Sequence, residues 1–178
     1  MPAKMRDRVF LCVLVMITLT LTLTGCGYHL TNAQANRKQS FQNIWIPYFS
    51  NESISPTAQT VLRRAFYDEI HALRGLDPAG SQETADLFMK AKIISYSSTA
   101  ASYNPHDQAR EYKLLLNVEL EAYKKGQPLP LWKGQIQGSK QYPADANLAL
   151  QRNAEEQALD AAARILAHRF ISAIEESY

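Results

Sequence analysis

Histidines and paired carboxylates are the side chains in this sequence that could do acid–base or metal chemistry. The four histidines are His29, His71, His106 and His168. They fall in four separate stretches, without the i,i+4 pair on one helix that a zinc-protease motif requires. Glu119 and Glu121 alternate along an expected strand, where carboxylates are ordinarily solvated charges. The sequence therefore predicts no enzymatic activity, no cofactor and no metal site.

Cys26 has the clearest chemistry, because it ends a segment built like a secretory signal peptide. Three basic residues (Lys4, Arg6 and Arg8) precede an apolar and threonine-rich run from Val9 to Leu23. This run is shorter than the roughly 20 apolar residues of a membrane-spanning helix. The stretch Leu23-Thr24-Gly25-Cys26 resembles a bacterial lipobox, in which cleavage precedes a cysteine that then receives acyl chains. We predict a cleaved signal peptide over residues 1–25 and lipidation at Cys26; an ordinary signal peptide or an uncleaved membrane anchor is the alternative.

The mature part of the chain is predicted to be electrically neutral. Removal of 25 of the 178 residues leaves 153, which suits one domain with its own core. The removed segment carries three basic residues and one acidic residue, so 16 of each sign remain. A nucleic-acid-binding protein would show a basic excess, and none is left. With Cys12 removed and Cys26 acylated, we also expect no disulfide and no thiolate metal site.

The first half of the mature chain is predicted to contain a tether, a strand and a helix. Residues 26–42 read as a lipidated N-terminus and polar tether, and residues 43–178 as a single domain. The run Ile44–Phe49 indicates a strand that Pro47 places at an edge or a bulge. A helix is expected to begin with Ser55 as its N-cap and Pro56 in its first position, and to end before Gly75.

The second half predicts three strands in a meander and a final helix. The strands are expected over residues 85–99, 112–123 and 131–140, with a connecting loop over 100–108 and a hairpin loop over 124–128. Asp145 or Asn147 would cap the helix, whose alanine-rich first half could lie close to Gly134 and Gly138 of the last strand. The predicted fold is α+β: a two-layer sandwich with two helices packed on one face of a mostly antiparallel four-stranded sheet, its other face polar.

Six cations on or beside the meander strands could hold a lipid phosphate or a sugar acid by charge-assisted hydrogen bonds. They are Lys90, Lys92, Arg110, Lys113, Lys133 and Lys140. The alternative is a solubilising surface that also discourages edge-to-edge pairing of strands.

Three short stretches together resemble the lipopolysaccharide-assembly lipoprotein family (LptE, the rare lipoprotein B type). They are Cys26-Gly27-Tyr28-His29-Leu30, Ile46-Pro47-Tyr48-Phe49-Ser50-Asn51 and Ile94-Ser95-Tyr96-Ser97-Ser98-Thr99. The order of the expected elements also matches this family over the whole mature chain. The resemblance implies an outer-membrane lipoprotein anchored in the inner leaflet, on the periplasmic side, through acyl chains such as palmitate.

The same resemblance implies a partner and a role. Members plug the LptD β-barrel, assist its assembly and help to pass lipopolysaccharide to the outer leaflet. The resemblance also implies delivery to the outer membrane, because the residue after the cysteine is Gly27 and not an Asp, which would redirect sorting. By extension, we expect Tyr103, Asn104 and Pro105 in the loop before Arg110 to contact the barrel or lipopolysaccharide. A pilot lipoprotein for another outer-membrane complex and a periplasmic lipoprotein enzyme are the alternatives.

Overall fold

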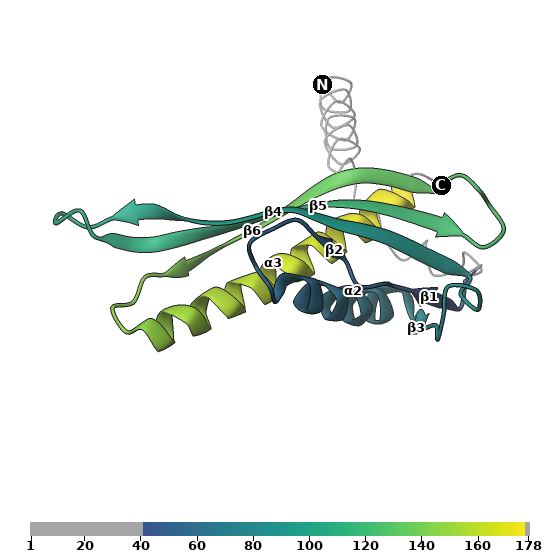
Figure 1. Cartoon of the computed structure of the whole chain (residues 1–178), viewed down its shortest axis with the longest axis horizontal. Helices are drawn as coiled ribbons and strands as arrows, with labels where there is room; N and C mark the ends of the chain where they lie inside the picture. The colour runs from purple at the N-terminus through teal and green to yellow at the C-terminus, as the bar shows by residue number, and fades with distance from the viewer. Residues whose placement is uncertain (1–40, 177–178) are drawn as a thin grey trace, which may run out of the picture. The chain divides into compact units, whose positions relative to one another are not determined.

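Two helices cover one face of a six-stranded sheet in the computed structural model, which describes residues 41–176 (Figure 1). In chain order the elements are β1 (Asn43–Trp45), β2 (Ser50–Asn51), α2 (Ala58–Arg74), β3 (Asp77–Pro78), β4 (Leu87–Tyr103), β5 (Ala109–Lys124), β6 (Trp132–Pro143) and α3 (Leu148–Glu176). The predicted signal peptide, Cys26 and most of the predicted tether lie outside the described residues, so these remain predictions.

The α+β class with two helices and a mostly antiparallel sheet is confirmed, but the predicted count of four strands is wrong. The sheet runs β3-β1-β4-β5-β6, and β2 also pairs with β4. The pairs β1–β3, β1–β4 and β2–β4 are parallel, so the sheet is mixed. The run predicted as one strand is split because Pro47 has no N–H to donate to a ladder. The side chains of Ile46 and Phe49 enter the core between the two short strands.

Helix α2 ends as predicted but begins later than predicted. It starts at Ala58, with Thr57 in the N-cap position and no side-chain hydrogen bond to the first turn. Ser55, the predicted cap, is instead buried with 8% of its surface exposed. At the other end, Gly75 adopts the left-handed conformation (φ 64°) and its N–H donates to the carbonyl of His71. Glycine suits this position because it has no Cβ to clash.

Strands β4 and β5 form a hairpin longer than the sequence predicts. β4 continues to Tyr103, so the loop expected from residue 100 is confined to residues 104–108. Asn104 closes this turn: its Oδ1 accepts the N–H groups of His106 and Gln108 at 2.9 and 3.0 Å. The predicted alternation of β5 is confirmed, with every second residue from Leu114 to Ala122 buried beneath the helices.

Helix α3 packs against β6, β5 and α2, and its predicted close approach to the sheet is confirmed at one glycine. Asn147 is its cap, because its Oδ1 accepts the N–H of Ala149 at 2.9 Å. A Cβ on Gly138 would lie 2.6 Å from the carbonyl oxygen of Ala162. Gly134 makes no such approach to the helix, because the indole of Trp132 fills the space above it.

Gly138→Ala is therefore expected to lower the free energy of unfolding by about 1–3 kcal/mol, the usual cost of overpacking a core. The added methyl group would meet the Ala162 carbonyl and lie 2.7 Å from Cγ of Leu166, so helix and strand must separate. Gly80→Ala is the matched control, because a Cβ there has no neighbour within 4 Å. Urea unfolding of both variants measures the difference, and equal stabilities would contradict the close packing.

Candidate binding surface

Three of the six predicted cations come together on the sheet face opposite the helices. Lys90 lies directly across from Glu121, which in turn faces Lys133 on the next strand. Lys92 lies across from Glu119 two residues further along. Residues directly opposite one another in an antiparallel pair project to the same face. Lysines and glutamates therefore alternate across β4, β5 and β6; we call this set the charged face.

Lys133 makes the most extensive ion pairing on the charged face. Its Nζ lies 2.6 Å from Oε1 of Glu121 and 3.6 Å from Oε1 of Glu119. Hydrogen bonds from Lys133 and from the Tyr123 hydroxyl lower the pKa of Glu121, and Glu121 in turn raises the pKa of Lys133. Both shifts favour the charged forms, so the pair stays ionised through the neutral range.

The other two lysines of the charged face also have partners. Lys92 Nζ lies 2.7 Å from Oε1 of Glu52, and this hydrogen bond raises the pKa of Lys92. Lys90 Nζ lies 4.8 Å from the ring centroid of Tyr123, within cation–π range. Lys92 and Lys133 thus form ion pairs with three glutamates (Glu52, Glu119 and Glu121), and a phosphate binding here must compete with these contacts.

The remaining three predicted cations lie elsewhere. Lys113 shares the uncovered face but lies closer to the hairpin turn. Lys140 is opposite Leu114, a core residue, and is therefore on the helix side of the sheet. Arg110 lies at the start of β5, where its carbonyl accepts the N–H of Ala144 at 2.9 Å. The six cations do not form one site.

Of the three predicted contact residues at the hairpin turn, Tyr103 and Pro105 are exposed, whereas Asn104 bonds within the turn. Tyr103 has 61% of its surface exposed, and Pro105 is also exposed. Asn104 uses its side chain to hold the turn, so its first role is structural. In Figure 1 this turn extends beyond the start of α3, which leaves Tyr103 and Pro105 accessible to a partner.

Two of the three histidines in the described residues, His71 and His168, contact acidic side chains, and His106 is exposed in the hairpin turn. His71 Nδ1 lies 3.4 Å from Asp77, and His168 Nε2 lies 2.8 Å from Glu69 on the facing helix. Across residues 41–176, no group of three or more histidine, cysteine or acidic residues is arranged to hold a metal ion. Neither helix described there is both long and apolar enough to cross a bilayer.

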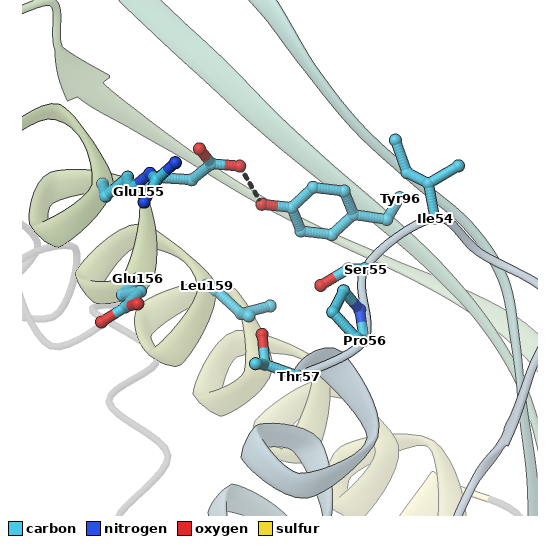
Figure 2. Close-up of a pocket in the computed structure, with 9 residues that line it drawn as sticks. Ile54, Ser55, Pro56, Thr57, Tyr96, Glu155, Glu156 and Leu159 are labelled. Atoms are coloured by element: carbon cyan, nitrogen blue, oxygen red, sulfur yellow. Dashed lines mark hydrogen bonds between the residues drawn. The ribbon is translucent and has the colours of Figure 1, made fainter. Parts of the chain in front are cut away.

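A pocket that the sequence did not predict lies between β4, the start of α2 and α3 (Figure 2). Its volume is about 280 Å³. Its lining is Ile54, Ser55, Pro56, Thr57, Tyr96, Arg152, Glu155, Glu156 and Leu159. Tyr96 donates a hydrogen bond to Glu155, and burial together with this bond raises the pKa of the tyrosine. These residues come from three distant segments, so no sequence spacing connects them.

Solved structures of bacterial proteins, a lipoprotein among them, share this two-helix α+β fold. Rare lipoprotein B from Shewanella oneidensis has a TM-score of 0.51 and 17% identity, over 76% of this chain and 96% of that one. A hypothetical protein from Chlamydia trachomatis has a TM-score of 0.55 and 8% identity, over 78% and 98%. A protein from Xanthomonas campestris has a TM-score of 0.53 and 10% identity, over 78% and 90%. At these identities the likeness shows the fold alone.

The chain belongs to the LptE family, described as lipopolysaccharide-assembly, whose sequence model matches residues 41–174. This confirms the resemblance found in the sequence. The LptE family is a non-enzymatic lipoprotein family. A search of curated proteins gave no match.

Proposed function

We propose that the mature chain is an outer-membrane lipoprotein that plugs the LptD barrel and takes part in lipopolysaccharide transport to the outer leaflet. The observation that carries this proposal is membership of the LptE family over residues 41–174. The predicted lipobox at Cys26 supports it, because acyl chains would hold the domain at the periplasmic side of the outer membrane. The chain would then reach the barrel from the membrane surface.

The charged face supports a role inside a barrel. The lumen of a large outer-membrane barrel is polar, so a plug needs a polar surface without a large net charge. The ion pairs of Lys92 and Lys133 with three glutamates balance the charge on this face and satisfy that requirement. In this proposal the exposed Tyr103 and Pro105 at the hairpin turn also contact the barrel or lipopolysaccharide.

Affinity purification through a C-terminal tag, followed by mass spectrometry, tests the partner. We expect LptD to be recovered in a one-to-one complex from detergent-solubilised membranes. Recovery of a secretin or another outer-membrane complex would instead establish the pilot-lipoprotein alternative. Recovery of the chain alone would overturn the proposed function.

The charged face is also where we predict contact with lipopolysaccharide. Replacement of Lys90, Lys92 and Lys133 together by glutamate is expected to weaken binding at least about tenfold, since hydrogen bonds to charged groups contribute about 1.5–3 kcal/mol each. Binding of purified lipopolysaccharide to the detergent-solubilised chain measures the change.

A second triple variant with glutamine at the same positions separates lost attraction from added repulsion. It removes the positive charges without introducing new negative ones, so it should weaken binding less than the glutamate variant does. Circular dichroism shows whether both variants are folded. Unchanged binding by a folded glutamate variant would remove the charged face as a lipopolysaccharide site.

A further inference from the structure

One side of β4 is only partly paired within residues 41–176. On the side away from β5, it pairs first with β1 at Leu87 and Phe88, then with β2 at Lys92 and Ile93. The N–H of Glu52 donates to the carbonyl of Ile93 at 3.1 Å, and the segment after Glu52 leads into α2. From Ser95 onward no strand of the described chain pairs with this side, so its backbone groups face outward there.

The unpaired segment has a regular register over the length of a short strand. The register against β5 shifts between Ile93 and Ser95 and again between Ala100 and Ser102, and it runs without interruption between them. The free edge of β4 is therefore Ser95–Ala100, about the usual strand length of 5–6 residues. A partner strand of that length would find a straight row of N–H and C=O groups.

The composition of this edge differs from that of β6, which forms the opposite side of the meander. β6 carries Lys133, Lys140 and Pro143, and charges and proline are the residues that block edge-to-edge pairing. The free edge of β4 contains only serine, threonine, alanine and tyrosine. It therefore lacks side chains that would repel an added strand.

The pocket lies beside the free edge. Tyr96 belongs to the edge and lines the pocket, while Ile54 beside it has 84% of its surface exposed (Figure 2). The Ser55 side chain points into the same space, and its Oγ has no hydrogen-bond partner among the described residues. Ser55 as a residue is 8% exposed, and its hydroxyl faces the pocket, where it is available to an incoming group. Leu159 of α3 provides an apolar wall.

We propose that an extended segment of the barrel partner pairs with β4 along Ser95–Ala100 and inserts one large side chain into this pocket. The identity of the partner rests on the proposed function. Backbone hydrogen bonds give affinity in this mode of recognition, and side-chain pockets give specificity. The inserted side chain has an apolar body, which contacts Ile54 and Leu159, and a polar end, which bonds the Ser55 hydroxyl.

Hydrogen exchange on the intact complex tests the strand pairing. The lipidated chain is compared alone and bound to its barrel, both in the same detergent. We expect every second backbone amide within Ser95–Ala100 to exchange at least about tenfold more slowly in the complex, because new hydrogen bonds protect amides from exchange. A recovered complex in which these amides exchange at the unbound rate overturns this inference alone.

A wild-type chain that retains no barrel overturns the proposed function and this inference with it. A chain that instead dimerises in a concentration-dependent way, with the same amides protected, shows that the occupant is a second copy and overturns the inference.

Two substitutions of exposed apolar residues test the pocket. Ile54→Asp places a charge in the pocket wall and is expected to weaken association with the barrel at least about tenfold (1.4 kcal/mol). Leu129→Asp is the matched control, because Leu129 is 76% exposed and lies outside the pocket lining. Both residues are exposed, so both variants should fold. Equal affinities of the Ile54→Asp variant and the wild type would overturn insertion of a side chain at this position.

Discussion

Phe170→Ala is expected to lower the free energy of unfolding by about 3–5 kcal/mol, the range measured for loss of a buried phenylalanine. Phe170 is fully buried in α3. Its ring centroid lies 5.7 Å from that of Phe66 in α2 and 5.5 Å from that of Trp132 in β6. The substitution would leave a cavity between two helices and the sheet. Because three separate elements line it, the cavity can close only if all three shift.

Urea unfolding followed by the fluorescence of Trp45 and Trp132 and by circular dichroism measures this effect. Phe170→Leu is the control, because it removes the aromatic ring but keeps most of the apolar volume, and should cost less than about 1.5 kcal/mol. If Phe170→Ala lowers the free energy of unfolding by less than about 1 kcal/mol, the packing of this side chain against α2 and β6 does not contribute as proposed. A change in the slope of the transition would point to a different degree of compaction.

The parts of the fold that sequence could predict are those with a long period or a distinctive end. The alternation of β5 extends over many residues, so its buried face was predicted correctly. Gly75 was placed correctly because a helix end often requires a left-handed residue. Helix α3 was predicted to be capped by Asp145 or Asn147, and the structure shows that Asn147 is the cap.

The short parallel strands could not be predicted because they carry no period. β2 and β3 have two residues each, and their pairing with distant strands depends on tertiary packing alone. β4 is longer than predicted because serine, threonine and alanine are compatible with both a loop and a strand. These residues of β4 form a strand because they pair with the regular strand β5.

The candidate sites show the same limit. Lys140 was grouped with the other cations by charge, although the alternation of β6 from Trp132 to Gly138 already placed it on the helix side. The ion pairs of Lys133 follow from strand register, which charge alone does not fix. The pocket at Tyr96 brings together three segments far apart in the chain, and no local pattern could indicate it.

Cys26→Ser is expected to abolish attachment of acyl chains and to lower the share of the chain that is found in the outer-membrane fraction. A serine lacks the thiol that carries the lipid, and each buried methylene of an acyl chain contributes about 0.8 kcal/mol to membrane binding. The described domain has no basic excess that would attract it to an anionic bilayer. Labelling with radioactive palmitate and separation of the two membranes measure both effects.

Cys12→Ser is the matched control, because Cys12 is the other cysteine of the chain and lies within the predicted signal peptide. It should leave palmitate incorporation and outer-membrane location unchanged. An ordinary signal peptide would make the two serine variants behave alike, with no palmitate on either. An uncleaved anchor would leave residues 1–25 on the purified wild-type chain, visible in its intact mass. Palmitate on the Cys26→Ser variant would contradict lipidation at this residue, and the mode of membrane attachment proposed for the plug would then be wrong.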